Sequence, residues 1–198
     1  LAKSDDNKDI AWLIATNVYH NATAYPATTS GHEDTPALTV LAPFLRNGYL
    51  HSAIREKGGA YGGGASFDAN SASFRFYSYR DPHCVATFLH FEKSIDWLLD
   101  NDHDADKLEE AILGIIGGMD KPASPAGEAV KACFSELHGR TKEMQETIRA
   151  KLLAVTIDDL KRVARTYLKD KPHVKASLAP LEKESQMAEL GFDCHKIG

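Results

Sequence analysis

The chain has 198 residues, of which 43% are hydrophobic and 26% are charged, with a formal net charge of −5 and an isoelectric point near 6.0. This is the composition of a folded globular protein, and it excludes the disordered and collagen-like classes. The negative charge gives no electrostatic support for binding nucleic acid or an anionic membrane. No apolar run reaches the ~18 residues that span a bilayer. We expect residues 1–198 to form a single domain, with residues 1–8 as a solvated lead-in.

The ends and cysteines of the chain bear on its origin. It begins at Leu1 rather than at methionine, which predicts that it is cut from a longer protein, and its first residues are too polar for a secretion signal. Cys84, Cys133 and Cys194 are odd in number and form no CxxC pair, which predicts a reducing compartment: the cytoplasm or, in a eukaryote, an organelle matrix. Without a secretion signal, the glycosylation pattern Asn21-Ala22-Thr23 is interpreted as a chance match.

The first part of the chain predicts one strand and two helical segments. Alternating side chains predict a strand over residues 10–19, and a loop rich in Thr, Gly, His and Pro follows over residues 20–34. Thr35-Pro36 carries the residues preferred at a helix N-cap and first turn, so a helix is expected to begin there. Pro43 should bend or restart this helix. Asn47-Gly48 predicts a break before a second helical piece over residues 49–56.

The middle of the chain predicts a β-hairpin, with strands over residues 65–68 and 73–79 joined by a turn at Asn70-Ser71. Asp81-Pro82 is predicted to cap the helix that follows. Apolar stripes at helical spacing then predict helices over residues 108–119, 125–137 and 141–152. The faces expected to point inward on the last two are Ala129, Val130, Cys133, Phe134 and Leu137, and then Met144, Ile148 and Leu152.

The end of the chain predicts the remaining elements. Thr156 and Asp159 form a T-x-x-D capping box before a further helix, and a strand over residues 173–178 precedes a short helix over residues 181–190. Few strands early, many helices late and one returning strand predict an α+β fold, because the βαβ alternation of a doubly wound fold is absent. We expect an antiparallel sheet with helices packed mainly on one face.

Glycine is concentrated in one segment, where five of the seven residues from 58 to 64 are Gly. Because Gly costs roughly 0.5–1 kcal/mol against Ala inside regular structure, such a cluster needs a reason. A dinucleotide-binding loop would need a third glycine where Phe67 stands, and a phosphate-binding P-loop would end in Gly-Lys-Ser/Thr. Both also need a strand before a helix, whereas the predicted order here is helix and then strand. The segment therefore marks either a kinked start to a strand or a close approach of another chain.

The candidate side chains for binding a metal or donating hydrogen bonds are histidines, one arginine and one tyrosine. The nine histidines form neither HxxxH nor HxxEH, so no metal site is predicted in this chain and the histidines are interpreted as surface or core residues. Arg55 and Tyr61 lie on either side of Gly58-Gly59, a pair that lets the chain reverse. A guanidinium and a phenol in one cleft would suit an oxygen that gains negative charge. The alternative is a surface Arg and a half-buried Tyr without a joint role.

The stretch from Arg55 to Ala65, REKGGAYGGGA, resembles a segment of the inverted-zinc-motif metallopeptidases of the insulinase and pitrilysin clan, and most of all the presequence-protease subgroup. The resemblance runs from about residue 10 to residue 180. Further segments that agree with it are LRNGYLH at 45–51, FRFYSYRDP at 74–82 and KPASPAGE at 121–128. The glycine segment is the specific part of this likeness, and the helical tail is weaker.

The resemblance implies a fold, a role and partners. Enzymes of this clan have four related α+β domains in two halves that close on a peptide, and the first domain carries HxxEH and the zinc. This chain resembles the last domain, and Arg55 and Tyr61 match the Arg and Tyr that the last domain brings to the scissile carbonyl. Gly58, Gly59, Gly62, Gly63 and Gly64 would let the substrate backbone lie close. The implied partners are a peptide substrate and the zinc-bearing N-terminal half, without which this piece should be inactive.

Two functions therefore follow from the sequence. The first is the C-terminal domain of a zinc-dependent oligopeptidase that degrades short unfolded peptides in a closed chamber. The second is a non-catalytic peptide-binding or assembly module that pairs with a separate zinc-bearing subunit.

Overall fold

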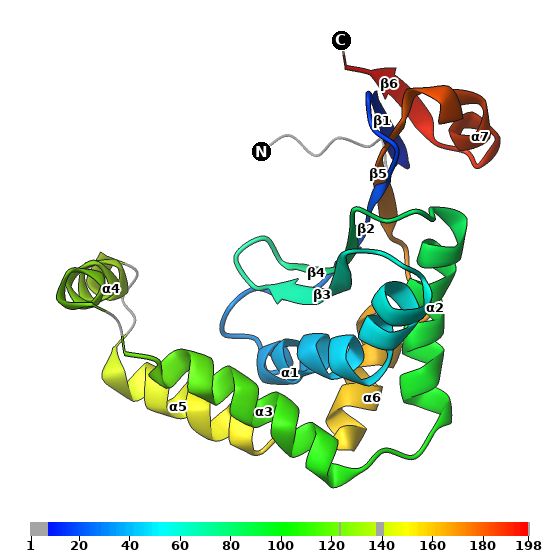
Figure 1. Cartoon of the computed structure of the whole chain (residues 1–198). Coiled ribbons are helices and arrows are strands. Elements are labelled where there is room, and N and C mark those ends of the chain that lie inside the picture. The colour runs from blue at the N-terminus through cyan, green and yellow to red at the C-terminus, as the bar shows by residue number, and fades with distance from the viewer. Residues whose placement is uncertain (1–7, 123, 138–140, 198) are drawn as a thin grey trace.

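The computed structural model describes residues 8–122, 124–137 and 141–197, so the predicted lead-in lies outside the described residues except for Lys8. In chain order the elements are β1 (Ile10–Ile14), β2 (His20–Pro26), α1 (Thr35–Leu45), the π-helix η1 (Arg46–Lys57), β3 (Gly62–Asp68), β4 (Ser73–Tyr79), α2 (Val85–Asp100), α3 (Ala105–Asp120), α4 (Pro125–Leu137), α5 (Lys142–Leu153), α6 (Ile157–Tyr167), β5 (Val174–Pro180), the 3-10 turn η2 (Leu181–Lys183), α7 (Glu184–Glu189) and β6 (Asp193–Lys196) (Figure 1).

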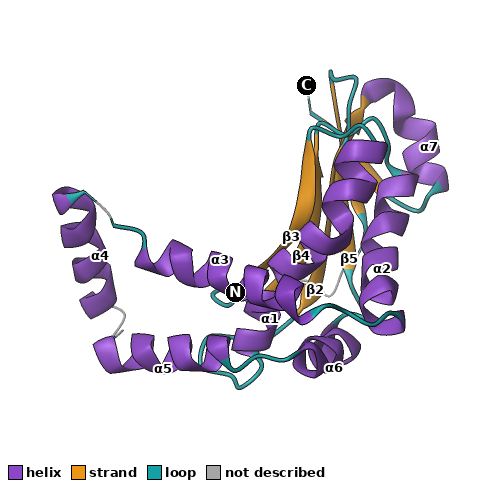
Figure 2. Cartoon of the chain, turned by 60° about the horizontal axis from the view of Figure 1, so that its bottom comes forward, coloured by secondary structure: helices purple, strands orange, loops and turns teal. Residues whose placement is uncertain are grey.

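The strands form one six-stranded sheet in the order β3-β4-β2-β5-β1-β6. Figure 2 shows α1 and α2 on one side of it, and on that side alternate strand residues are buried, among them Leu13, Phe74 and Phe76. The predicted α+β fold with helices mainly on one face is confirmed. The sheet is not antiparallel throughout, because β1 runs parallel to both β5 and β6. These pairings join segments more than 150 residues apart in sequence, so no local pattern could indicate their direction.

The predicted loop over residues 20–34 is wrong in its first part, where β2 forms a central strand between β4 and β5. The strand predicted over residues 10–19 correspondingly ends at Ile14. The inward residues of β2 are Asn21, Thr23 and Tyr25, all buried. Two of these three are polar, so β2 lacks the apolar alternation by which a strand is usually found.

The helix after the loop starts where predicted, at Thr35, but it does not break at Asn47-Gly48. Pro43 cannot donate a backbone hydrogen bond, and three residues after it, at Arg46, the α-helical pattern gives way to the wider π-helix η1. Gly48 lies inside η1, where a Cβ atom would come within 2.3 Å of the Trp97 ring. Its role is therefore to admit a large side chain of α2 rather than to end a helix.

The hairpin β3–β4 and the capping box at Thr156 are confirmed, although β3 begins earlier than predicted, at Gly62. The helix predicted to follow Asp81-Pro82 begins at Val85. Asp81 still organises its start, since its carboxylate accepts hydrogen bonds from the His83 backbone N–H at 2.9 Å and from the Thr87 hydroxyl at 2.7 Å. The edge strand β6 was not predicted, because its four residues, DCHK, carry no apolar alternation.

The inward faces predicted for α4 and most of α5 are wrong. On these helices only Leu152 of the predicted inward residues is buried, whereas Val130, Phe134, Met144 and Ile148 are exposed. Figure 1 shows the reason: α3 and α5 extend away from the sheet, and α4 lies at their far end. The apolar stripes correctly predicted helices but not what lies beside them. No helix in the described ranges is both long and apolar enough to cross a bilayer.

Candidate functional site

The predicted site lies at the turn that joins η1 to β3. The Gly59 N–H donates to the Arg55 carbonyl and the Ala60 N–H to the Ile54 carbonyl, both at 3.1 Å. Carbonyls at the end of the helix are thus hydrogen-bonded before the chain reverses direction. Gly59 has φ +76°, a conformation that favours glycine. At Gly58 a Cβ atom would come within 2.6 Å of the Ile54 carbonyl oxygen. The sharp reversal therefore depends on both glycines.

This turn brings the two predicted donor residues to the surface at one end of β3. Arg55 lies in the last turn of η1 and is exposed. Tyr61 is 67% exposed and directly precedes β3, where its backbone N–H donates to the Arg80 carbonyl at 3.3 Å. Within the described ranges, no hydrogen bond or ion pair occupies the Arg55 guanidinium. Both side chains are therefore accessible to a bound ligand.

The glycines of β3 have different surroundings. A Cβ atom at Gly63 would meet the Ile54 side chain at 3.0 Å, and one at Gly64 would meet the Arg46 side chain at 2.8 Å. These two glycines are explained by the chain's own packing. Apart from its two neighbours in the chain, no atom lies within 4 Å of the position that a Cβ atom would take at Gly62, so the space beside it is open. Because β3 is an edge strand, this opening lies at the margin of the sheet.

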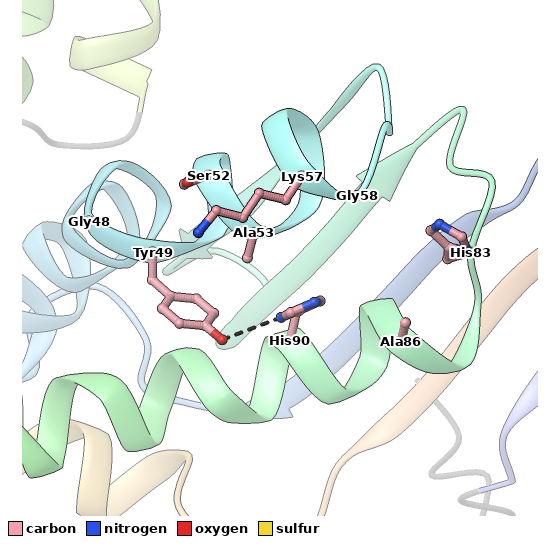
Figure 3. A pocket seen from close by; sticks show the side chains of 9 residues that line it. All are labelled: Gly48, Tyr49, Ser52, Ala53, Lys57, Gly58, His83, Ala86 and His90. Carbon is pink, nitrogen blue, oxygen red and sulfur yellow. Dashed lines mark hydrogen bonds between the residues drawn. The ribbon is translucent and has the colours of Figure 1, made fainter.

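A cavity of about 570 Å³ lies nearby, between η1 and α2 (Figure 3). Its polar lining comes from Tyr49, Ser52, Lys57, His83 and His90, and the Tyr49 hydroxyl lies 3.3 Å from Nδ1 of His90. Burial, together with the Lys93 ammonium, lowers the pKa of His90. Gly58, one of the predicted substrate-binding glycines, lines the cavity, whereas Arg55 and Tyr61 do not, so the cavity adjoins the predicted site without containing its two donor residues.

The part of the chain that the structure describes contains neither a cluster of metal ligands nor an accessible glycosylation site. Within residues 8–122, 124–137 and 141–197, no three His, Cys, Asp or Glu side chains come together as metal ligands. Asn21 is only 1% exposed, and its amide donates to Ser78 Oγ at 3.1 Å and to the His83 carbonyl at 2.9 Å. The folded chain therefore cannot present Asn21 to a glycosylating enzyme.

The structure also reveals neighbours of Tyr61 that sequence reasoning missed. The Tyr61 ring packs edge-on against Tyr79 of β4, with centroids 5.6 Å apart, and Tyr79 packs in the same way against His20 of β2 at 5.0 Å. The alternation of β4 placed Tyr77 and Tyr79 on one face. The contact with His20 depends on the β2–β4 register, which the sequence does not give.

Comparison with known proteins assigns the chain to a family. A family model described as the PreP C-terminal domain matches residues 9–177. The mitochondrial presequence protease of Yarrowia lipolytica is 41% identical over 145 residues, which is 73% of this chain and 14% of that protein. The corresponding protein of Emericella nidulans is 35% identical over 195 residues, 98% of this chain and 18% of that protein. The chain thus spans less than a fifth of either relative.

Solved structures share the fold at low sequence identity. A protease from Helicobacter pylori superposes with a TM-score of 0.71 at 18% identity, covering 88% of this chain and 44% of that one. The peptidase M16 inactive domain from Pseudomonas fluorescens gives a TM-score of 0.67 at 17% identity, covering 87% and 43%. The fold and the family match agree with the resemblance carried by the glycine segment. The chain therefore belongs to the PreP C-terminal domain family.

Proposed function

We propose that this chain is a single domain at the C-terminal end of a zinc-dependent oligopeptidase that degrades short unfolded peptides in a closed chamber. Its family membership and the placing of Arg55 and Tyr61 support this role. By the resemblance, both residues match the Arg and Tyr that the last domain of such enzymes contributes, and both are exposed on either side of Gly58-Gly59. The remaining parts of the longer protein, above all its N-terminal half, would be the partner that completes the site.

The proposed chemistry of this chain is hydrogen-bond donation to the scissile carbonyl. Zinc held by the N-terminal half would polarise that carbonyl, and the described residues of this chain gather no ligands for it. The Arg55 guanidinium supplies a permanent charge, and the Tyr61 hydroxyl supplies one O–H. Donors fixed where negative charge develops stabilise the tetrahedral oxyanion more than the ground state. Closure of the two halves would bring them to the substrate and exclude larger proteins.

We propose that the glycine segment accepts the substrate backbone. Gly62 is the direct contact, because the space beside it is open. Gly58, Gly59, Gly63 and Gly64 contribute by holding the turn and the start of β3 in a shape that keeps side chains away from that opening.

We place the protein in the mitochondrion, because its relatives are named mitochondrial presequence proteases. The prediction of a cytoplasmic location is not supported.

The decisive experiment is Tyr61→Phe in the full-length protein, which removes one hydroxyl and keeps the ring. We expect kcat for a short unfolded peptide to fall by about 10²–10³. Tyr77→Phe is the matched control, because Tyr77 lies on the same side of the neighbouring strand and loses the same group. A Tyr61→Phe protein with the parental kcat would remove Tyr61 from the catalytic assignment.

The alternative is a non-catalytic module that binds peptides or assembles with a separate zinc-bearing subunit. It is favoured by one structural neighbour, the M16 domain that is described as inactive. Size-exclusion chromatography of this chain mixed with a zinc-bearing M16 subunit distinguishes the two. A stable complex that gains peptidase activity would support separate subunits, whereas covalent continuity of the two halves in one translated protein would exclude them.

A further inference from the structure

The face of the sheet that turns away from α1 and α2 carries a line of aromatic side chains that begins at Tyr61. Tyr79 contacts Tyr61 on one side and His20 on the other, with centroids 5.6 Å and 5.0 Å apart. Both contacts are edge-on, with interplanar angles of 78° and 77°. The proposed catalytic phenol is therefore the first ring of a longer array.

The strand register carries this line across the rest of the sheet. Leu178 of β5 is paired with His20 of β2 on one side and with Trp12 of β1 on the other. Trp12 is paired in turn with His195 of β6, and their rings lie 5.0 Å apart. We call this line the aromatic row; its members are Tyr61, Tyr79, His20, Leu178, Trp12 and His195.

Exposing the rings of the aromatic row to water is energetically unfavourable. Trp12 is 42% exposed and Tyr79 is 46% exposed, although residues next to them on the same strands are fully buried on the other face. Exposed apolar rings gathered along one face of a sheet mark an interaction site more often than apolar side chains that are scattered singly. Each aromatic member also has an apolar ring and a polar edge, so it can contact a side chain and donate to a carbonyl.

We propose that the aromatic row binds an extended, apolar segment of the peptide substrate on its way to Tyr61. This inference rests on the proposed function, because the row reaches the reacting bond only through Tyr61. From β4 to β6 the row crosses four strand spacings, roughly 19 Å, which is the length of about six extended residues. Only an unfolded peptide can lay that much backbone along the sheet, so the row selects for substrate length and for absence of structure.

The test compares Trp12→Ala with the parental full-length protein on two unstructured peptides of about 5 and about 20 residues that share one cleavage site. Trp12 lies three strand spacings, roughly 14 Å, beyond Tyr79. A peptide of about 5 residues cleaved near its centre extends only two or three residues, roughly 8–10 Å, toward Trp12, so only the longer peptide can reach it. For the longer peptide we expect KM to rise about tenfold with kcat unchanged. For the shorter peptide we expect no change in either constant. Leu89→Ala, which truncates an exposed apolar side chain on α2, is the matched control.

Other outcomes would overturn the proposal. Equal KM values for the longer peptide in the parental and Trp12→Ala proteins would show that the row does not bind substrate. An equal change for both peptides would indicate a general structural effect. A fall in melting temperature without a length-dependent KM would show that another part of the protein covers the row. The Tyr61→Phe experiment uses the short peptide, so the proposed function can stand while this inference fails.

Discussion

The two faces of the sheet are built from the same strands, yet they differ in almost every property. On the covered face Phe74 and Phe76 are completely buried, and Phe76 stacks on Phe91 of α2 with centroids 5.5 Å apart. On the other face Tyr77 and Tyr79 alternate with them along β4 and remain exposed. Successive strand residues point to opposite faces, so a single segment can serve both purposes. The comparison assigns stability to the covered face and leaves the open face for the peptide recognition proposed above.

The largest effect is expected from Phe76→Ala, which removes a completely buried ring. Phe76 contacts Tyr25, Phe74 and Phe91, with ring centroids 5.4–5.9 Å apart. The lost contacts and the cavity should lower the free energy of unfolding by about 3–5 kcal/mol. Urea denaturation measures this directly. Tyr77→Ala, one residue along the strand, should cost less than about 1 kcal/mol, and equal losses in the two variants would refute the division between the faces.

The next effect concerns polar groups on the covered face. Besides its two donated hydrogen bonds, Asn21 accepts one from the Ser177 hydroxyl at 2.9 Å, which ties β2 to β5 and β4. Asn21→Ala leaves several buried groups without this partner and should cost about 2–3 kcal/mol. Ser177→Ala removes one of these bonds and should cost less. If Asn21→Ala unfolds at the parental urea concentration, the buried polar network contributes nothing to stability.

These residues also show how far sequence could predict the fold. Local signals were reliable: the alternation of β4 and the Thr156–Asp159 capping box both correspond to observed structure. The sequence does not predict β2, because its buried positions include the polar residues Asn21 and Thr23, and the side-chain partners of Asn21 lie far away in the sequence. The apolar stripe of α4 predicted a helix, but burial also needs a neighbour, and a helical period does not supply one.

The candidate site likewise has one part that the sequence could predict and one part that it could not. A local glycine signal and a family resemblance identified Arg55, Tyr61 and the turn between them. The turn itself can be explained physically, since Gly58 and Gly59 each meet a backbone requirement. The aromatic row could not be predicted, because it depends on pairing between strands as distant as β1 and β6. His20 even fell within the segment predicted to be a loop.

The smallest effect is expected from the charge of Asp34, which stabilises the fold at neutral pH and stops doing so only in acid. Its carboxylate is 6% exposed and lies between α1 and α6, where it accepts from the Tyr167 hydroxyl at 2.7 Å and lies 2.6 Å from Nη1 of Arg162. Burial alone would raise the pKa of Asp34, but the Tyr167 hydroxyl and the Arg162 guanidinium outweigh it and hold the pKa below its ordinary value. Burial and Asp34 together raise the pKa of Tyr167 to about 12, so this phenol stays a donor.

Because the folded pKa of Asp34 lies below the unfolded one, its charge stabilises the fold above the unfolded value of about 3.9 and stops doing so as the pH falls through the folded value. Urea midpoints measured between neutral pH and about pH 3 should therefore fall less steeply for Asp34→Asn than for the parental chain. The difference between the two curves isolates Asp34 from other carboxylates. Parallel curves would mean that the interaction of Asp34 with Tyr167 and Arg162 contributes no pH dependence to stability. Apolar packing would then be the main support of the covered face.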